Sequence, residues 1–249
     1  MFDALIRRGF EIEFHSHAEA ILSVDFPEVA RELESALSGT TIPIAEIIAG
    51  GGGEARATQR LRHALTDLGW PKFTFRIERR INDVPKESQS HEIDHVRSFA
   101  DGRRIALEIE WNNKDPFFDR DLENFKRLHA DGAISVGVII TRGRSLQDAL
   151  RRLVGRFAAE RDIRSFEDLA PWGYTPSERQ RRDILARTGR TRDPLTFADA
   201  FAAVFVADKF GEATTHWRKL EDRIRRGVGN PCPLLLIGLP STIVAFAAA

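Results

Sequence analysis

The sequence predicts an α/β protein in which helices flank a central mixed β-sheet, and three observations support this fold class. Residues 72–81 and 103–111 alternate between apolar and charged side chains, as half-buried strands do. Residues 133–141 form a short, almost wholly apolar run, which is typical of a strand at the buried centre of a sheet. Helical periodicities lie between these strands, and the resulting order favours an α/β sandwich around one sheet.

The amino-terminal elements come first. Residues 5–15 are predicted as a strand, and residues 26–37 as a helix, because apolar side chains recur there at helical spacing. A second helix is predicted over 54–68, where leucines form one apolar stripe and Gly69 marks the end. These helices precede the strand at 72–81 and are expected to cover the sheet.

The carboxyl-terminal half begins with a well-marked helix start. Asp115 can cap the helix, and Pro116 fits its first turn. Phe118 and Leu122 open an apolar stripe along this helix. The elements predicted after residues 133–141 are a helix over 145–158, mixed helical signals over 160–215, a helix over 216–226 and a buried strand over 233–238.

Residues 91–99 and 103–111 are predicted to form a hairpin, and its turn decides which side chains meet. A two-residue turn would place Asp94 opposite Ile109 and point it away from Glu108. A three-residue loop with Gly102 in the left-handed region would pair residue 99 with 103, and Asp94 with Glu108. We predict the second register.

This register gathers three carboxylates on one face of the sheet. The face of residues 103–111 that carries Ile105 is apolar and explains the fold, whereas the other face carries Glu108 and Glu110. Alternation alone is equally consistent with two ordinary solvent-exposed glutamates. With Asp94 added, the three carboxylates repel one another and indicate a bound cation. Oxygen ligands without His or Cys suit Mg²⁺ better than zinc.

Composition limits the possible classes of protein. The 249 residues are 42% hydrophobic, which suffices for a core, and no apolar run approaches a membrane span. The amino terminus lacks the apolar segment of a signal peptide, so a cytoplasmic protein is expected. The single cysteine, Cys232, excludes an internal disulfide framework and a cysteine-based zinc site. Net charge is zero, but arginines crowd the second half, either as solvated helix faces or as a surface for phosphates.

The acidic hairpin resembles a known catalytic motif. "EID" at 92–94 and "EIE" at 108–110, thirteen residues apart, resemble the PD-(D/E)xK nuclease core. The surrounding sequence resembles the type II restriction endonucleases of the BglII/BstYI family. The segments that carry this resemblance, in family order, are "SHAEAILSVDFPEV", "GGGE", "LTDLGWPK", "RRIALEIEW" and "RIRRGVGNPCPLLLIGLP".

The resemblance covers most of residues 10–150 and then 215–240. It implies a restriction endonuclease-like (PD-(D/E)xK) core over residues 1–249 as a single domain. Residues of about 155–212 have no recognised counterpart and are predicted to be a helical insertion.

The resemblance also implies the activity and its site. Asp94 and Glu108 would bind Mg²⁺, and Glu110 would orient or deprotonate the attacking water. The general motif has lysine at position 110, whereas BglII-like enzymes carry glutamine and BamHI-like enzymes carry glutamate, as this chain does. Glu54, after four glycines, is either an acidic residue in the first turn of a helix or a fourth catalytic carboxylate. The residues predicted to contact DNA are Asn112, Asn113, Lys114, Arg142, Arg144 and Asn230.

The function implied is cleavage of both strands of a short palindromic DNA site, leaving 5′-phosphates. The family's sites centre on GATC, its members are homodimers, and a cognate DNA methyltransferase would be the functional partner. A structure-specific or repair nuclease on the same core is an alternative. A catalytically inactive DNA-binding module is another, and an arginine-rich protein-interaction domain, which would bind no metal, is a third.

Overall fold

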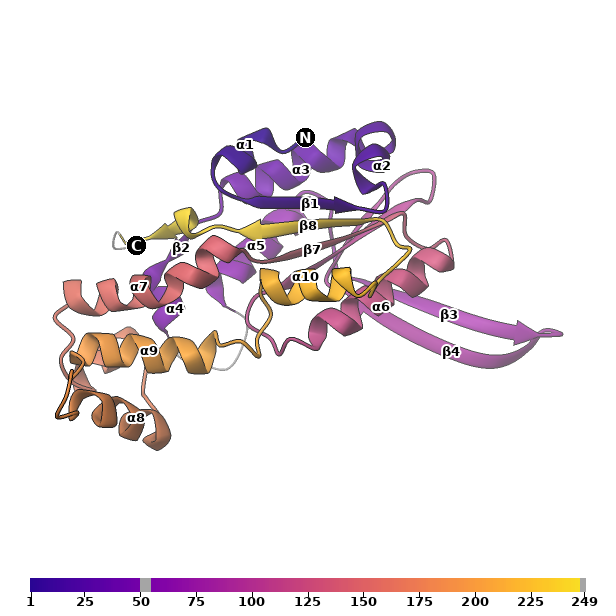
Figure 1. Cartoon of the computed structure of the whole chain (residues 1–249). Helices are drawn as coiled ribbons and strands as arrows, with labels where there is room; N and C mark the ends of the chain where they lie inside the picture. The colour runs from indigo at the N-terminus through magenta and orange to yellow at the C-terminus, as the bar shows by residue number, and fades with distance from the viewer. Residues whose placement is uncertain (50–54, 247–249) are drawn as a thin grey trace.

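A computed structural model describes residues 1–49 and 55–246 of the chain. At its centre lies a five-stranded sheet with the order β1-β8-β7-β6-β5 (Figure 1). Strands β6, β7 and β8 are parallel, and the two edge strands are antiparallel to their neighbours. The predicted mixed sheet is therefore confirmed. The strands span β1 Glu11–His15, β5 His95–Ser98, β6 Arg104–Glu110, β7 Val136–Arg142 and β8 Leu234–Leu239.

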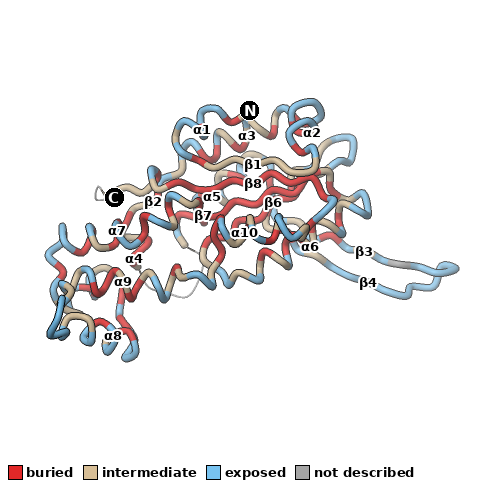
Figure 2. The backbone as a smooth tube through the Cα atoms, in the orientation of Figure 1, coloured by how far each residue is buried: buried red, intermediate tan, exposed pale blue. Residues whose placement is uncertain are grey.

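Helices cover both faces of this sheet, because the strands at its centre are apolar on both sides. Every residue of β7 and β8 is buried (Figure 2). On one face, the core joins the sheet to the helices α2, α3, α5 and α7; on the other, it joins the sheet to α6 and α10. These helices span α2 Ala18–Asp25, α3 Pro27–Ser38, α5 Arg56–Asp67, α6 Phe117–Ala130, α7 Arg144–Glu160 and α10 Trp217–Arg225.

Strand β6 shows the predicted division of its side chains. Ile105, Leu107 and Ile109 belong to the core under α3, α5 and α7, whereas Ala106 belongs to the core under α6. Glu108 and Glu110 follow Ala106 at every second position and lie on the α6 side. The two glutamates are therefore covered by a helix and do not face solvent.

The amino-terminal prediction was only half right. Residues 5–15 are not one strand, because Asp3–Arg7 forms the short helix α1 and only Glu11–His15 is extended. Gly9, with a φ of 92°, turns the chain between them. Leu5 is fully buried, so its tertiary packing favours the helical turn over an extended edge.

A long two-stranded ribbon was also missed. Strands β3 (Phe73–Ile81) and β4 (Val84–Ile93) pair antiparallel and project from the body of the protein (Figure 1). The predicted strand at 91–99 is in fact two strands, β4 and β5, with Asp94 between them. Strand β4 could not be predicted, because its residues "VPKESQS" are exposed and lack apolar alternation.

The remaining helices form a lobe at one end of the molecule, away from the ribbon (Figure 1). Helices α8 and α9 pack against each other, and α9 packs on α7. Residues 155–212 thus contain the end of α7, η1, α8 and α9, and whether they are an insertion stays a prediction. Within the described ranges, no helix is long and apolar enough to cross a membrane. The other elements are α4 Ile44–Ile48, η1 Glu167–Trp172, α8 Glu178–Thr188, α9 Phe197–Lys209, η2 Ser241–Ile243, β2 Ile42–Pro43 and β9 Val244–Ala245.

Candidate active site

The hairpin adopts the predicted register, and this brings Asp94 to Glu108. The backbone N–H of Phe99 donates to the carbonyl oxygen of Arg103 at 3.0 Å, and Gly102 has a φ of 87°. Strand β5 pairs His95 with Leu107, so Asp94 lies opposite Glu108. The two carboxyl groups share a hydrogen bond. The three-residue turn of the hairpin therefore brings the side chains of Asp94 and Glu108 into contact.

Helix α6 adds a buried carboxylate that sequence reasoning missed. Asp121 is 0% exposed and lies against the pair on β6, where Glu108 is 4% and Glu110 is 2% exposed. A signal was present in the sequence. Asp121 follows Phe118 by three residues and precedes Phe125 by four, which places it on the buried stripe of the helix.

Burial makes the carboxyl groups hard to ionise together. Burial, and then repulsion from Asp121, raises the pKa of Glu108 to about 10 and that of Glu110 to about 8. Burial also raises the pKa of Asp121. Glu110 and Asp121 share a hydrogen bond, as Glu108 and Asp94 do. Without a cation, the cluster therefore retains protons near neutral pH.

Two polar side chains, Asn113 after β6 and Arg120 on α6, form hydrogen bonds or ion pairs with Glu110 and Asp121. Asn113 Nδ2 donates to Glu110 Oε2 at 2.8 Å. Arg120 donates from Nε to Asp121 Oδ1 at 2.9 Å, and its Nη2 lies 3.6 Å from Glu110 Oε1. Asn113 was predicted to contact DNA, and in this structure its side-chain amide orients the carboxylate of Glu110.

Asp94 faces a pocket of about 280 Å³ where β6 ends and α5 begins. The Asp94 side chain is 35% exposed, and the Nζ of Lys72 lies 4.0 Å from its Oδ1. Asn112 also lines this pocket, and its predicted contact with DNA stays a prediction. Its full lining is Ala55, Thr58, Arg62, Asp94, Ile109, Trp111, Asn112 and Asn113.

The donor set fits a magnesium ion. Among the described residues, no three His, Cys, Asp or Glu side chains are placed to enclose a metal by themselves. Mg²⁺ is commonly held by only one or two carboxylates and keeps several waters, so Asp94 and Glu108 suffice. Asp121 Oδ2 is buried and receives no N–H donor from the described residues, so its only close polar neighbours in the cluster are carboxyl groups. Glu54, the fourth carboxylate considered from the sequence, lies outside the described residues.

Arg142 requires a correction. It was predicted to contact DNA, but it is 0% exposed. Its guanidinium donates to the carbonyl oxygens of Trp111 at 2.7 Å and Thr215 at 2.6 Å. It also donates to Thr214 Oγ1 at 2.7 Å. Arg142 therefore braces the loop after β6, and we remove it from the predicted DNA contacts.

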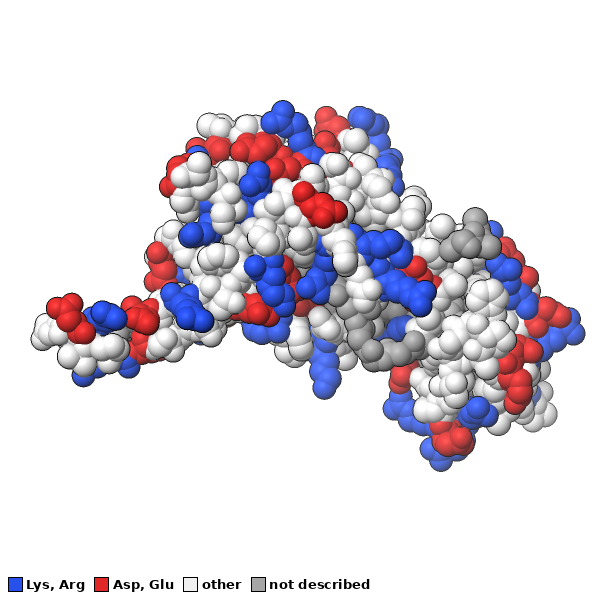
Figure 3. All heavy atoms as spheres, turned by 180° about the vertical axis from the view of Figure 1, so that it is seen from behind, with Lys and Arg blue, Asp and Glu red and all other residues white. Residues whose placement is uncertain are grey.

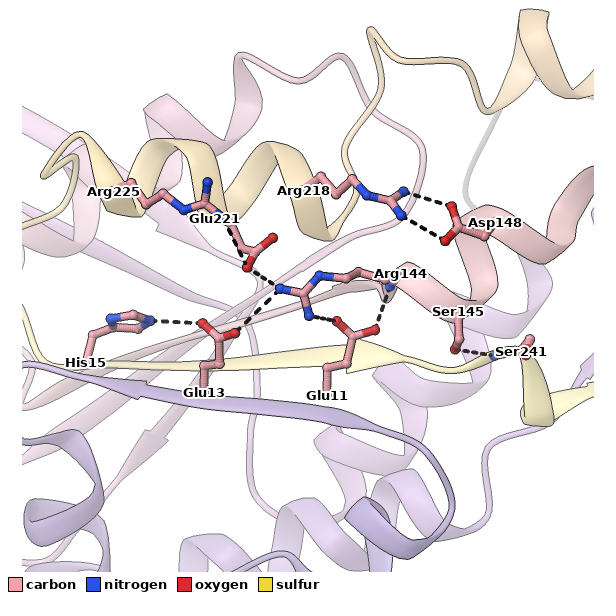
Figure 4. A network of polar contacts seen from close by, with 10 residues as sticks. All are labelled: Glu11, Glu13, His15, Arg144, Ser145, Asp148, Arg218, Glu221, Arg225 and Ser241. Atoms are coloured by element: carbon pink, nitrogen blue, oxygen red, sulfur yellow. Dashed lines mark hydrogen bonds and ion pairs between the residues drawn. The ribbon is translucent and has the colours of Figure 1, made fainter.

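Arg144 is engaged by carboxylates from two other elements (Figure 4). Its Nη1 lies 2.9 Å from Glu11 Oε2 on β1, and its Nη2 is bonded to Glu221 on α10. Burial raises the pKa of Glu11, while the backbone N–H of Arg144 stabilises its charge. In this conformation Arg144 joins α7 to the sheet edge, and its side chain stays 40% exposed, so its contact with DNA remains a prediction.

The last two predicted contacts lie outside the carboxylate cluster. Lys114 is exposed and forms an isolated backbone bridge with Thr214. Asn230 is exposed in the loop between α10 and β8, and its peptide bond to Pro231 is cis. Neither side chain contacts Asp94, Glu108 or Glu110, so a role in binding DNA stays a prediction for both.

The mixed sheet has a buried acidic pair on its parallel strand β6, and Asp94 lies beside the pair, just before β5. This arrangement is consistent with a restriction endonuclease-like fold. A family model of the restriction endonucleases BglII/BglIII matches residues 10–239, and the chain belongs to this family. A search among curated proteins found no match. The chain is thus a site-specific endonuclease that acts on double-stranded DNA, as the resemblance implied.

Proposed function

We propose that the protein is a Mg²⁺-dependent type II restriction endonuclease that cuts both strands of a short palindromic site and leaves 5′-phosphates. One observation carries this proposal. The hairpin register places Asp94 against Glu108, beside Glu110, in a chain of a restriction endonuclease family. A protein with only a structural use for this sheet would have no reason to bury carboxyl groups that repel one another.

In this proposal each carboxylate has its own task. Asp94 and Glu108 hold the cation, which when bound would polarise the phosphate and lower the pKa of a water. Asn113 occupies Glu110 Oε2, so Oε1 is the atom that accepts a proton from the attacking water. The pocket at Asp94 is where the DNA backbone would enter. On the face shown in Figure 3, basic side chains gather between the ribbon and the helical lobe, which would favour a polyanion.

A homodimer follows from the same proposal. A two-fold symmetric protein matches a palindromic site and places one active site at each strand. We place the dimer surface on helix α6 over residues 119–130 and its neighbours. A site centred on GATC and a cognate DNA methyltransferase are proposed from the family alone. We propose that the helices of 155–212 are an insertion within one domain, which either extends the grip on DNA or enlarges the dimer.

Metal-dependent digestion of unmethylated plasmid and phage DNA tests this function. The wild-type protein in Mg²⁺ should give discrete fragments that disappear in EDTA and with Glu108→Gln. Glu19→Gln, the same substitution at an exposed position of α2, is the matched control and should cut normally.

Other outcomes would contradict the proposal in distinct ways. Unspecific degradation or cutting only at DNA junctions would indicate a repair nuclease. Intact DNA that still shifts on a gel would indicate an inactive binding module.

A further inference from the structure

Arg120 is a cation held in place at the edge of the carboxylate cluster. Its Nε and Nη2 lie 2.9 and 2.8 Å from Asp121 Oδ1, and its guanidinium stacks over the Phe117 ring at 4.4 Å. The same Nη2 lies 3.6 Å from Glu110 Oε1. One edge of the guanidinium is therefore fixed by the protein. The side chain nevertheless remains 54% exposed.

Asp121 explains why the guanidinium stays there. A third buried carboxylate beside Glu108 and Glu110 is electrostatically unfavourable, and Asp121 Oδ2 receives no N–H donor from the described residues. Its Oδ1 nevertheless receives two donors from Arg120. Asp121 therefore orients the Arg120 guanidinium at the edge of the site. Among the described residues, Arg120 is the N–H donor that binds the Asp121 carboxylate.

A phosphodiester approaching Glu110 comes close to four acidic side chains, three of which are buried. When Asp94, Glu108, Glu110 and Asp121 are ionised they repel it, and one divalent ion offsets only part of their charge. Arginine is the side chain best suited to add positive charge here, because its planar fork binds phosphate oxygens through two parallel donors. In the described part of the chain, Arg120 Nη1 forms no hydrogen bond to protein and is available for such a contact.

We propose that Arg120 is a catalytic residue that binds a nonbridging oxygen of the scissile phosphodiester, and that Asp121 is the positioning residue that aims it. This inference rests on the proposed nuclease function. It assigns to helix α6 the positive charge that faces the phosphate, next to Glu110. Preorganised donors of this kind stabilise the charge that develops on the phosphate during attack.

The test compares Arg120→Ala and Arg120→Lys with Arg31→Ala. Arg31 is exposed on α3, outside the proposed site and dimer surface, and serves as the matched control. Single-turnover cleavage in Mg²⁺ should fall about 10²- to 10³-fold in Arg120→Ala. Arg120→Lys should recover part of this loss, because it keeps the charge but not the fork. Arg31→Ala should stay within about twofold of wild type, and thermal unfolding should show that all three variants are folded.

A second readout does not depend on cleavage. Binding to a generic duplex in EDTA, measured over a series of salt concentrations, counts the phosphates contacted. Arg120→Ala should reduce the slope of log K against log salt by about one per bound chain. Asp121→Asn should slow cleavage, and adding it to Arg120→Ala should cause no further loss beyond about twofold.

The proposal and the underlying function fail differently. Cleavage by Arg120→Ala within about threefold of wild type, or an unchanged salt slope, would overturn the role of Arg120 while leaving the nuclease intact. A wild-type protein that cuts no DNA would overturn the proposed function. The salt slope would still decide whether Arg120 contacts a phosphate, and absence of any DNA binding would overturn both.

Discussion

Replacing Glu108 by glutamine should make the metal-free protein more stable while it abolishes cleavage. Glutamine has the shape of a protonated glutamate but needs no proton to remain neutral. In the wild-type protein Glu108 is 4% exposed, and its carboxyl group shares a hydrogen bond with Asp94. The substitution therefore removes a buried ionisable group without opening a cavity.

The magnitude follows from the pKa of Glu108, which rises from its ordinary value of 4.5 to about 10 in the folded protein. Because the folded pKa is the higher one, stability is fully present below pH 4.5 and is lost as pH rises towards 10. Each pH unit in this range costs about 1.4 kcal/mol, so roughly 5 kcal/mol is the upper limit at pH 8. Proton sharing within the cluster reduces the expected gain to about 2–3 kcal/mol, or a Tm rise of about 4–12 °C.

The assay is urea unfolding of wild type and Glu108→Gln in EDTA at pH 5 and pH 8. The variant should be more stable at pH 8 and nearly equal to wild type at pH 5. Mg²⁺ should then stabilise the wild-type protein at pH 8 but have little effect on the variant. Glu19→Gln should match wild type under every condition.

Two results would refute this reasoning. If Glu108→Gln were no more stable than wild type at pH 8, burial of Glu108 would not be the source of its raised pKa. If the difference in unfolding free energy were the same at pH 5 and pH 8, the effect would not come from ionisation.

Three further predictions concern the scaffold, each checked by the free energy of unfolding. Arg142→Ala should lose about 3–5 kcal/mol, because it strips donors from buried carbonyl oxygens; a loss below about 1 kcal/mol would contradict the bracing role. Gly137→Ala should lose about 1–3 kcal/mol, since the added Cβ would lie 2.4 Å from Phe125 Cδ2; wild-type stability would show that α6 yields freely. Burial lowers the pKa of His216 to about 4, so its contribution to stability should fall as pH drops below about 6.5. Relative to His216→Gln, wild type should lose about 2 kcal/mol between pH 7 and pH 5, and a constant difference would contradict this.

The register of the β5–β6 hairpin could be predicted because it depends on the residues of its turn. Gly102 at the left-handed position of a three-residue loop fixes the pairing of the strands, and the pairing places Asp94 against Glu108. Asp121 could have been found by the same kind of argument, since its spacing from Phe118 puts it on the buried stripe of α6. The turn residues and the spacing of apolar side chains thus suffice to predict which carboxylates meet in the candidate site.

The contacts of Arg142, at the end of β7, and of Arg144, just after it, could not be predicted in this way. Arg142 is bound by Thr215, and Arg144 by Glu11 and Glu221, which are all distant in sequence. Whether an arginine meets DNA or a buried carbonyl depends on which elements pack around it, and periodicity does not report that. Strand β4 was missed for a related reason, because a ribbon exposed on both faces has no apolar pattern to detect.

The most direct test of the central claim is to sequence the ends that the wild-type protein produces from unmethylated phage DNA in Mg²⁺. If the carboxylate cluster is the catalytic centre of a site-specific endonuclease, all ends should derive from one palindromic sequence and carry 5′-phosphates, and none should form with Glu108→Gln. Ends scattered over unrelated sequences, or the same ends produced by Glu108→Gln, would contradict the account.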